Sequence, residues 1–380
     1  MDRRQALKKT AGIAAGLGLA AGIAACDNGG SSTASEGSAA PAVAKKKLTL
    51  KMVTTWPKGL PGLGESPERI AERVETMTDG AIKIKVYAAG ELVPAFEAFD
   101  AVSTGQADLY HGAEYYWQGK SKAFNFFTAV PMGLTSTENN AWIYHGGGQE
   151  LWDELSAKFN IKAMPAGNTG VQMGGWFRKE INTLDDFKGL KMRMPGLGGE
   201  VLRRLGANAE ALAGPDIFQA LQQGRIEATE WVGPWNDQSM GFYRVAKYYY
   251  VPGFHEPGST LAVGVNLKVW YDLSDSQRMI LSQACMAEDS YGYAQFNHFN
   301  AGALRNLVEK HDVKIRSFSP EINTEIARIS GEVVKETAQE DELTNRIYQS
   351  FLKARADGIA WSQVADEAYM RDRRLPYDYG

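Results

Sequence analysis

Hydrophobic and polar residues alternate along residues 48–56, LTLKMVTTW, and this period of two predicts a β-strand. The apolar positions of residues 66–80 are instead three or four apart, which predicts a helix with one apolar face. We expect Ser66 to cap this helix and Pro67 to lie in its first turn. A second alternating run follows at 82–87. The order strand, helix, strand predicts a parallel pair of strands with a crossover helix, and therefore an α/β lobe.

The same kind of unit recurs twice further along the chain. Residues 98–112 align with residues 217–231, and each segment predicts a short amphipathic helix, a glycine stop at Gly105 or Gly224, and a strand. Polar and aromatic residues follow each strand, EYYW in the first unit and EWVGPW in the second. Two such units predict two lobes of related build. Since ligands of open α/β sheets bind beyond the carboxyl ends of the strands, we expect both ends to line one cleft.

A further strand and a long helical stretch complete the pattern. Residues 190–196, LKMRMPG, predict a strand that ends at Pro-Gly, with Arg193 on the face opposite the two methionines. Leu343, Ile347 and Phe351 form an apolar stripe on a helix that either braces the lobes or pairs with another subunit. The predicted organisation is an export signal at 1–26, a flexible tether at 27–46, lobe I at 47–158 plus 233–271, lobe II at 159–232 plus 272–342, and a C-terminal helical extension at 343–380.

The first residues have the composition of a targeting signal rather than of a folded element. Cationic residues, among them the adjacent Arg3 and Arg4, precede an apolar Ala/Gly-rich run that ends in IAAC at Cys26. Arginine pairs are typical of twin-arginine export signals, although Ala6 stands where a phenylalanine is usual. IAAC also has the form of a bacterial lipobox, and the Gly/Ser-rich residues that follow favour a lipidated Cys26 on a tether. The alternative is that Cys26 is removed with an ordinary signal.

Composition and charge narrow the function classes. Hydrophobic residues make up 44% of the chain and charged residues 23%, which is typical of a globular protein. The formal net charge is −4, without a basic surplus, so we expect no nucleic-acid partner. Cys285 is the one cysteine outside the signal and is predicted to lie in the core. The five histidines are scattered, and their spacing does not predict a zinc site.

Three segments together resemble one family of transport proteins. FKGLKMRMPG, DIFQALQQGRIEATEW and YYVPGFHEPG, in this order, are similar to segments of the solute-binding proteins of tripartite ATP-independent periplasmic (TRAP) transporters. The resemblance covers roughly residues 47–365 and is greatest to the branch that binds 2-oxo acids or lactate with a cation. It implies a two-lobed α/β fold of the periplasmic-binding-protein kind, with the ligand in a cleft between the lobes. It also implies a periplasmic receptor that delivers its solute to membrane subunits, and a C-terminal helix that can mediate a homodimer.

The resemblance implies a set of site residues. Arg193 occupies the position that pairs with the substrate carboxylate, and the cation, Na⁺ or Ca²⁺, would be held by Gln172, Glu230 and the backbone oxygen of Trp231. Tyr116 and Asn168 are further candidates for substrate contact, and the Trp231 ring is a candidate for the pocket wall. The branch often has another aromatic residue where this chain has Phe254-His255, so the identity of the solute stays open.

Each of these residues also has an ordinary structural interpretation. Arg193 could instead form an ordinary salt bridge at the surface or between the lobes. Glu230 could instead form a salt bridge to Arg178 or Lys179. Gln172 is compatible with a polar strand edge and Tyr116 with packing between lobes. His111 and His255 have no partners at catalytic spacing and are predicted to be structural.

Two other function classes remain at this point. One is an exported metal-assisted enzyme that acts on carboxylates, although the sequence has no G-x-S-x-G and no H-E-x-x-H motif. The other is a binding protein whose ligand is a signal, with a sensor as partner. We expect a binding protein rather than an enzyme, because capture of a solute requires no covalent chemistry.

Overall fold

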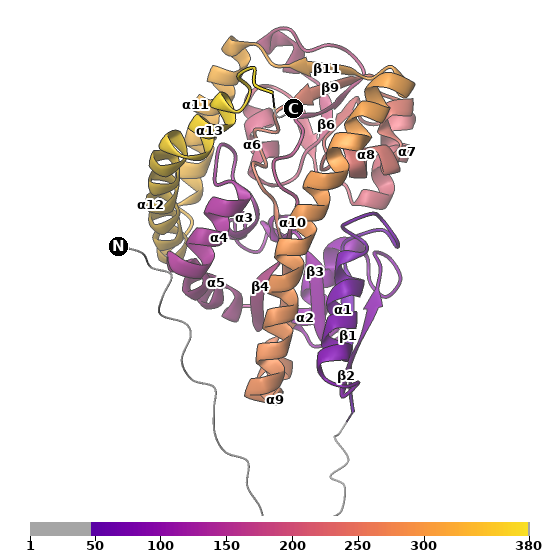
Figure 1. Ribbon diagram of the computed structural model, residues 1–380, viewed down its shortest axis with the longest axis vertical. Helices are drawn as coiled ribbons and strands as arrows, with labels where there is room; N and C mark the ends of the chain where they lie inside the picture. The colour runs from indigo at the N-terminus through magenta and orange to yellow at the C-terminus, as the bar shows by residue number, and fades with distance from the viewer. Residues whose placement is uncertain (1–46, 379–380) are drawn as a thin grey trace, which may run out of the picture. The chain divides into compact units, whose positions relative to one another are not determined.

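Two β-sheets with flanking helices organise residues 47–378, the part of the chain that the computed structural model describes (Figure 1). The predicted α/β class with two lobes is confirmed. Sheet A has the strand order β2-β1-β3-β10-β4, and sheet B has the order β11-β9-β5-β8-β6-β7. The strands are β1 (Leu48–Thr54), β2 (Ile82–Tyr87), β3 (Leu109–Gly112), β4 (Ile161–Asn168), β5 (Gly175–Phe177), β6 (Lys191–Arg193), β7 (Asn208–Glu210), β8 (Ala228–Thr229), β9 (Tyr248–Val251), β10 (Thr260–Asn266) and β11 (Lys314–Ser317).

The helices differ greatly in length. Within the described residues, none combines the length and the apolar composition that crossing a membrane requires. The helices are α1 (Ser66–Met77), α2 (Ala98–Ser103), α3 (Phe124–Thr128), α4 (Ser136–His145), α5 (Gly148–Ala157), α6 (Gly196–Arg204), α7 (Gly214–Gln222), α8 (Pro234–Met240), α9 (Leu267–Asp272), α10 (Asp275–His311), α11 (Pro320–Thr337), α12 (Glu342–Val364) and α13 (Asp366–Asp372). The export signal, Cys26 and the tether lie outside the described residues.

The first strand, helix and strand form the expected parallel unit. β1 and β2 pair in parallel, and α1 between them buries Ile70 and Val74. Ser66 is the first helical residue rather than the cap, because its hydroxyl is used elsewhere: it lies 3.4 Å from the carbonyl oxygen of Ala166. This contact ties the start of α1 to β4 across the sheet.

The internal repeat corresponds to one unit in each sheet. α2 leads into β3 in the middle of sheet A, and α7 leads into β8 inside sheet B. The aligned glycines have matching backbone conformations, with φ of 82° at Gly105 and 75° at Gly224. Only glycine adopts this left-handed region without strain, so each helix stops at the same point of the unit.

The expected lobe boundaries differ from the strand pairing at two places. Residues 161–168, expected in lobe II, form β4, which pairs antiparallel with β10 in sheet A. Residues 248–251, expected in lobe I, form β9, which pairs with β5 and β11 in sheet B. The sequence patterns predict no strand at either segment, and they do not indicate a partner strand so distant in the sequence.

Two segments that cross between the sheets run side by side. Residues 169–174 link β4 to β5, and residues 252–259 link β9 to β10. Gln172 N donates to Glu256 O at 3.1 Å, and Gly253 N donates to Gln172 O at 2.8 Å. A Cβ atom at Gly253 would lie 2.7 Å from that Gln172 oxygen, so the close approach requires glycine. We call this hydrogen-bonded pair of segments the crossover ribbon.

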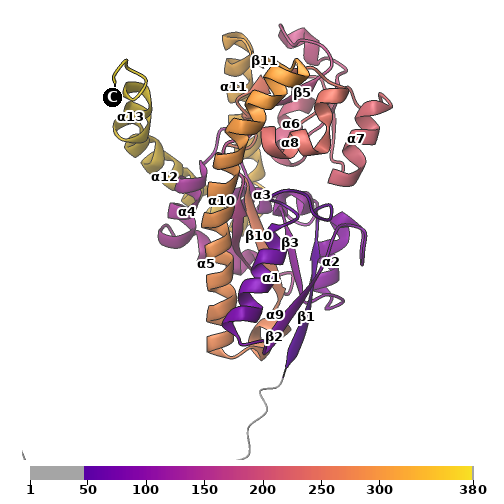
Figure 2. The same cartoon turned by 45° about the vertical axis from the view of Figure 1, so that its right-hand side comes forward.

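A third connection and a C-terminal extension complete the fold. α10 packs against α1 and β4 beside sheet A and against α8 beside sheet B, and Figures 1 and 2 show it along both. The predicted apolar stripe of the extension is confirmed, since Leu343, Ile347 and Phe351 of α12 are buried. Cys285 is buried in α10, as expected of a core cysteine.

Candidate functional site

Arg193 and Glu230 lie side by side at the carboxyl ends of two neighbouring parallel strands. Arg193 ends β6 and is in register with Thr229 of β8, so Glu230 is the first residue beyond β8. The Arg193 guanidinium forms an ion pair with Glu230 Oε1, and its Nε donates to Leu212 O at 3.2 Å. The two side chains are only 1% and 0% exposed. Glu230 therefore has an ion-pair partner, as the structural interpretation expects, but the partner is Arg193 rather than Arg178 or Lys179.

Aromatic side chains surround the Arg193 guanidinium. Arg193 Nη2 donates to the Tyr116 hydroxyl at 3.3 Å, and its Cζ lies 5.1 Å from the centre of the Trp231 ring. The Trp56 ring lies 6.3 Å from the rings of both Tyr116 and Trp231. Tyr116 and Trp56 follow strands of sheet A, whereas Arg193 ends β6 and Trp231 follows β8 in sheet B. The structure thus brings together Tyr116, Arg193 and Trp231, three of the predicted site residues, from both lobes.

Three buried polar atoms in this region have no partner among the described residues. They are Trp231 Nε1, Gln172 Oε1 and His255 Nδ1. The other amide atom of Gln172, Nε2, donates to Glu256 Oε2 at 2.7 Å and to Thr169 Oγ1 at 3.0 Å. Unsatisfied buried polar atoms are costly, and they often mark a place where water, an ion or a ligand binds.

Asn168 is held by protein groups alone. Its Oδ1 accepts hydrogen bonds from Gly170 N at 2.9 Å and from Ser136 Oγ, and its Nδ2 donates to Thr260 Oγ1 at 3.1 Å. These contacts fix the end of β4 where the crossover ribbon begins. The predicted substrate contact of Asn168 is therefore not supported by a free polar atom, and it stays a prediction.

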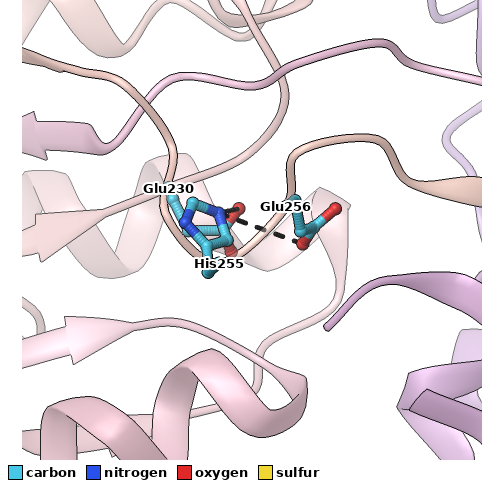
Figure 3. A group of neighbouring side chains, drawn as sticks. All are labelled: Glu230, His255 and Glu256. Carbon is cyan, nitrogen blue, oxygen red and sulfur yellow. Dashed lines mark hydrogen bonds and ion pairs between the residues drawn. The ribbon is translucent and has the colours of Figure 1, made fainter. Parts of the chain in front are cut away.

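Glu230, His255 and Glu256 form a compact buried cluster (Figure 3). His255 Nε2 lies 3.2 Å from Glu230 Oε2 and 4.0 Å from Glu256 Oε1. One potential ligand atom from each residue lies within 4.8 Å of the others, and no other such His/Cys/Asp/Glu group is found among residues 47–378. His255 and Glu256 come from the crossover ribbon, whereas Glu230 follows β8.

Sequence reasoning missed Glu256 and treated His255 as structural. Both residues stand in the segment YYVPGFHEPG, which also carries the family resemblance, but the neighbouring carboxylate Glu230 is far away in the chain. Their proximity depends on the pairing of the crossover segments. His111, in contrast, is structural as expected: Trp56 Nε1 donates to its Nδ1 at 2.7 Å, and burial lowers its pKa to about 4.

Burial and mutual repulsion perturb the ionisable groups of the cluster. Burial, and next the negative charge of Glu230, raise the pKa of Glu256 to about 7. Burial opposes protonation of His255, but its hydrogen bond to Glu230 and the two negative charges raise its pKa overall. Burial likewise opposes the charge of Arg193, and the Glu230 carboxylate outweighs it, so the pKa of Arg193 is raised. The carboxylates lie where a bound positive charge would stabilise them.

The residues present fit a hard cation. Glu230 and Glu256 supply carboxylate oxygens, and Gln172 Oε1 is a buried amide oxygen that no group among residues 47–378 contacts by a hydrogen bond. Oxygen ligands of this kind are the ones that Na⁺ and Ca²⁺ take in proteins. Glu256, an additional acidic neighbour, accepts a hydrogen bond from Gln172 and belongs to the cluster with Glu230, and the role of Gln172 and Glu230 as cation ligands stays a prediction.

Comparison with known proteins identifies the family of the chain. The model of the family described as bacterial extracellular solute-binding protein, family 7 (DctP) matches residues 52–341. The chain is 42% identical over 319 residues to the monocarboxylate 2-oxoacid-binding periplasmic protein all3028 of Nostoc sp., covering 84% of this chain and 87% of that protein.

Two solved TRAP solute-binding proteins have similar structures. One, from Pseudoalteromonas atlantica with bound sodium and pyruvate, has a TM-score of 0.83 and 40% identity, with 86% of this chain and 99% of that one covered. The other, a mixed-occupancy dimer from Bordetella bronchiseptica with copurified calcium and picolinate, has a TM-score of 0.84 and 35% identity, with 86% and 97% covered. The chain therefore belongs to the DctP family of extracytoplasmic solute-binding proteins, the receptors of TRAP transporters.

Proposed function

We propose that this protein captures a small 2-oxo or 2-hydroxy monocarboxylate, of the size of pyruvate or lactate, together with a cation, and delivers it to TRAP membrane subunits. The observation that carries the proposal is the buried ion pair of Arg193 with Glu230, whose carboxylate lies in one cluster with Glu256, the hydrogen-bond partner of Gln172. The relative from Nostoc and the structure with sodium and pyruvate support the substrate class.

Arg193 is the proposed anchor for the solute carboxylate. A guanidinium offers two parallel N–H donors that match a carboxylate, and the structure already holds this guanidinium against one. Tyr116 Oη, which lies 3.3 Å from Arg193 Nη2, would donate a hydrogen bond to the same carboxylate. Trp231 Nε1 is a second donor without a partner among the described residues. These groups orient one end of the solute without any covalent step.

The proposed cation ligands are Gln172, Glu230, Glu256 and the backbone oxygen of Trp231. A bound cation supplies positive charge and coordinates oxygen, so it favours acids with an oxygen next to the carboxylate over plain fatty acids. Glu230 is shared between the two halves of the site, because it contacts Arg193 on one oxygen and His255 on the other. Solute and cation binding should therefore be coupled through this carboxylate.

Aromatic walls indicate a small solute. The centre of the Trp56 ring lies 6.3 Å from the ring centres of both Tyr116 and Trp231. Trp56 and Trp231 are buried, and Tyr116 is partly buried. Gly214 keeps the Trp231 ring in place, since a Cβ atom there would lie 2.8 Å from that ring. Such walls leave room for a short carbon chain.

Calorimetric titration tests the proposal. Protein stripped of cations is titrated with pyruvate and with lactate, with and without Na⁺ or Ca²⁺. We expect binding of the solute to require the cation. Arg193→Ala should lower the solute affinity about 100-fold and lower the cation affinity by less than that. Glu230→Ala should weaken solute and cation together. Absence of binding in the wild type, or unchanged binding in Arg193→Ala, would contradict the proposal.

We also propose that two copies of the chain pair through the C-terminal helices. α12 buries its first half, but Ile359, Trp361 and Val364 in its second half are 37%, 68% and 73% exposed. Large exposed apolar residues on a projecting element are typical of interaction sites. The dimeric relative from Bordetella bronchiseptica supports this assignment.

The proposed location is the periplasm. The family is extracytoplasmic, and the first residues of the chain have the composition of an export signal. Lipidation of Cys26 would tether the protein to the membrane, and mass spectrometry of the protein from membranes would detect a diacylglyceryl cysteine at its N-terminus.

A further inference from the structure

Asp237 of α8 is a buried carboxyl that contacts the backbone beside the candidate site. The residue is 1% exposed. One of its oxygens, Oδ1, accepts a hydrogen bond from Val232 N at 3.0 Å. The other, Oδ2, accepts hydrogen bonds from Trp176 Nε1 at 2.9 Å and from the Tyr249 hydroxyl at 2.6 Å. Both oxygens have partners, so the direction of the carboxyl group is fixed.

The hydrogen bond from Val232 N determines the direction of the Trp231 carbonyl. The Trp231 C=O and the Val232 N–H belong to one planar trans peptide group, in which they point in opposite directions. An acceptor on this N–H therefore fixes where the Trp231 oxygen points, and it also polarises the carbonyl. Among residues 47–378, no hydrogen bond to the Trp231 oxygen is found. The oxygen is thus oriented without being used by another group of the described chain.

The backbone at Trp231 lies next to two other proposed cation ligands. Glu230 precedes it in the chain. Met173 N donates to Val232 O at 3.0 Å, so the residue that follows Gln172 contacts the residue that follows Trp231. The peptide is therefore held by α8 through its N–H, and the next carbonyl is held by the crossover ribbon.

Two aromatic residues support Asp237 through its other oxygen. Trp176 of β5 and Tyr249 of β9 are paired in sheet B, and their rings stack with centres 3.9 Å apart. Both contact Oδ2, whereas Val232 N contacts Oδ1. A change at Tyr249 therefore perturbs the same buried carboxyl but leaves the acceptor of Val232 N in place.

We propose that Asp237 is a positioning residue for the cation: by accepting the Val232 N–H, it fixes the direction of the Trp231 carbonyl oxygen as a cation ligand. This inference deepens the proposed function and rests on it, because it concerns the cation of the same site. Groups that orient the ligands of a metal commonly contribute about 10- to 100-fold to its affinity. A residue that acts through packing alone would change the stability of the fold instead.

Separate titrations of cation and solute test the inference. Protein stripped with a chelator is titrated by calorimetry with Ca²⁺ at fixed pyruvate, and then with pyruvate at saturating Ca²⁺. We expect Asp237→Ala to weaken Ca²⁺ binding about tenfold or more. The pyruvate affinity at saturating Ca²⁺ should stay close to that of the wild type, since Arg193 still anchors the carboxylate. Tyr249→Phe is the matched control and should leave the Ca²⁺ affinity unchanged, and urea unfolding gives the stability of both variants.

Two outcomes would overturn the inference: an unchanged Ca²⁺ affinity in Asp237→Ala, or equal losses of Ca²⁺ affinity in Asp237→Ala and Tyr249→Phe. Should Asp237→Ala fail to fold, NMR of the ¹⁵N-labelled wild type decides. Coordination of the Trp231 oxygen strengthens the hydrogen bond of Val232 N–H, so this amide proton should move downfield when Ca²⁺ binds, and an unmoved resonance contradicts the proposal.

The two proposals fail in different ways. A wild type that binds Ca²⁺ and pyruvate, combined with either overturning outcome, rejects the role of Asp237 alone. A wild type that binds neither 2-oxo acids nor cations rejects the proposed function, and the role of Asp237 with it.

Discussion

Glu114 is a buried carboxyl that is held by hydrogen bonds rather than by a cationic side chain. It follows β3, accepts a hydrogen bond from Trp152 Nε1 at 2.7 Å and another from the Tyr110 hydroxyl, and is fully buried. Burial raises its pKa to about 7 from the ordinary 4.5. The two hydrogen bonds favour the ionised carboxylate, but burial outweighs them, so folding favours the protonated form of Glu114.

This raised pKa predicts how stability depends on pH. The folded chain binds the Glu114 proton more tightly than the unfolded chain, so this contribution is complete below pH 4.5 and is lost as the pH rises to about 7. Glu114→Gln resembles the protonated form. We therefore expect the stability of the wild type relative to this variant to fall by about 3 kcal/mol between about pH 4 and pH 8. Urea unfolding of both proteins at these pH values measures it, and a constant difference would contradict the prediction.

Single residues also show what the sequence can reveal about the site. Arg193 and Glu230 are each adjacent to a strand end with a distinctive pattern, so their position at the sheet edge is predictable. Glu256 and His255 are in a loop, and they reach Glu230 only because the two crossover segments pair with each other. That pairing depends on long-range backbone hydrogen bonds, which no local periodicity encodes.

Among the elements, α12 combines a packed half and an exposed half. Phe351 packs against Phe126 and Trp142, with ring centres 5.2 and 5.8 Å apart. Trp361, further along the same helix, is 68% exposed. The apolar residues of the first half are therefore packed in the core, whereas the last turns of the helix expose theirs.

The two halves of α12 should respond differently to substitution. We expect Phe351→Ala to cost about 3–5 kcal/mol of unfolding free energy, because it leaves a cavity between α12, α3 and α4. Trp361→Ala should change it by less than about 0.5 kcal/mol in the monomer, since it removes an exposed ring. Chemical denaturation of dilute samples provides both values. Equal losses in the two variants would show that the second half of α12 is packed as well.

The periodicity of the sequence predicts several helices and strands, but it does not predict which strands pair with each other. The first strand-helix-strand unit, the two repeated helix-strand units and the apolar stripe of α12 follow from periodicity, and the structure has them where expected. The assignment of β4 and β9 to sheets does not follow from periodicity. Neither strand is predicted from the sequence, and the sheet of each is decided by partners that lie elsewhere in the chain, β10 for β4 and β11 for β9.

At the scale of the whole molecule, the proposed dimer is testable without any ligand. We expect the wild type to elute as a dimer at micromolar concentration, and Trp361→Glu combined with Val364→Glu to elute as a monomer, because the charges would be buried in the interface. Light scattering coupled to size exclusion gives the mass of each. Solute binding, measured by calorimetry, should persist in the monomer, and a monomeric wild type would contradict the proposal.

The crossover ribbon has a consequence for engineering. Its segments, 169–174 and 252–259, link the two sheets and also carry Gln172, His255 and Glu256. If the proposed site is right, we expect a substitution in the ribbon to change both how tightly the solute is held and how readily the two sheets separate. Residues of the aromatic wall, such as Trp56 and Tyr116, lie outside the ribbon. A biosensor with altered selectivity but unchanged response time should accordingly be built by varying the wall, with the ribbon left intact.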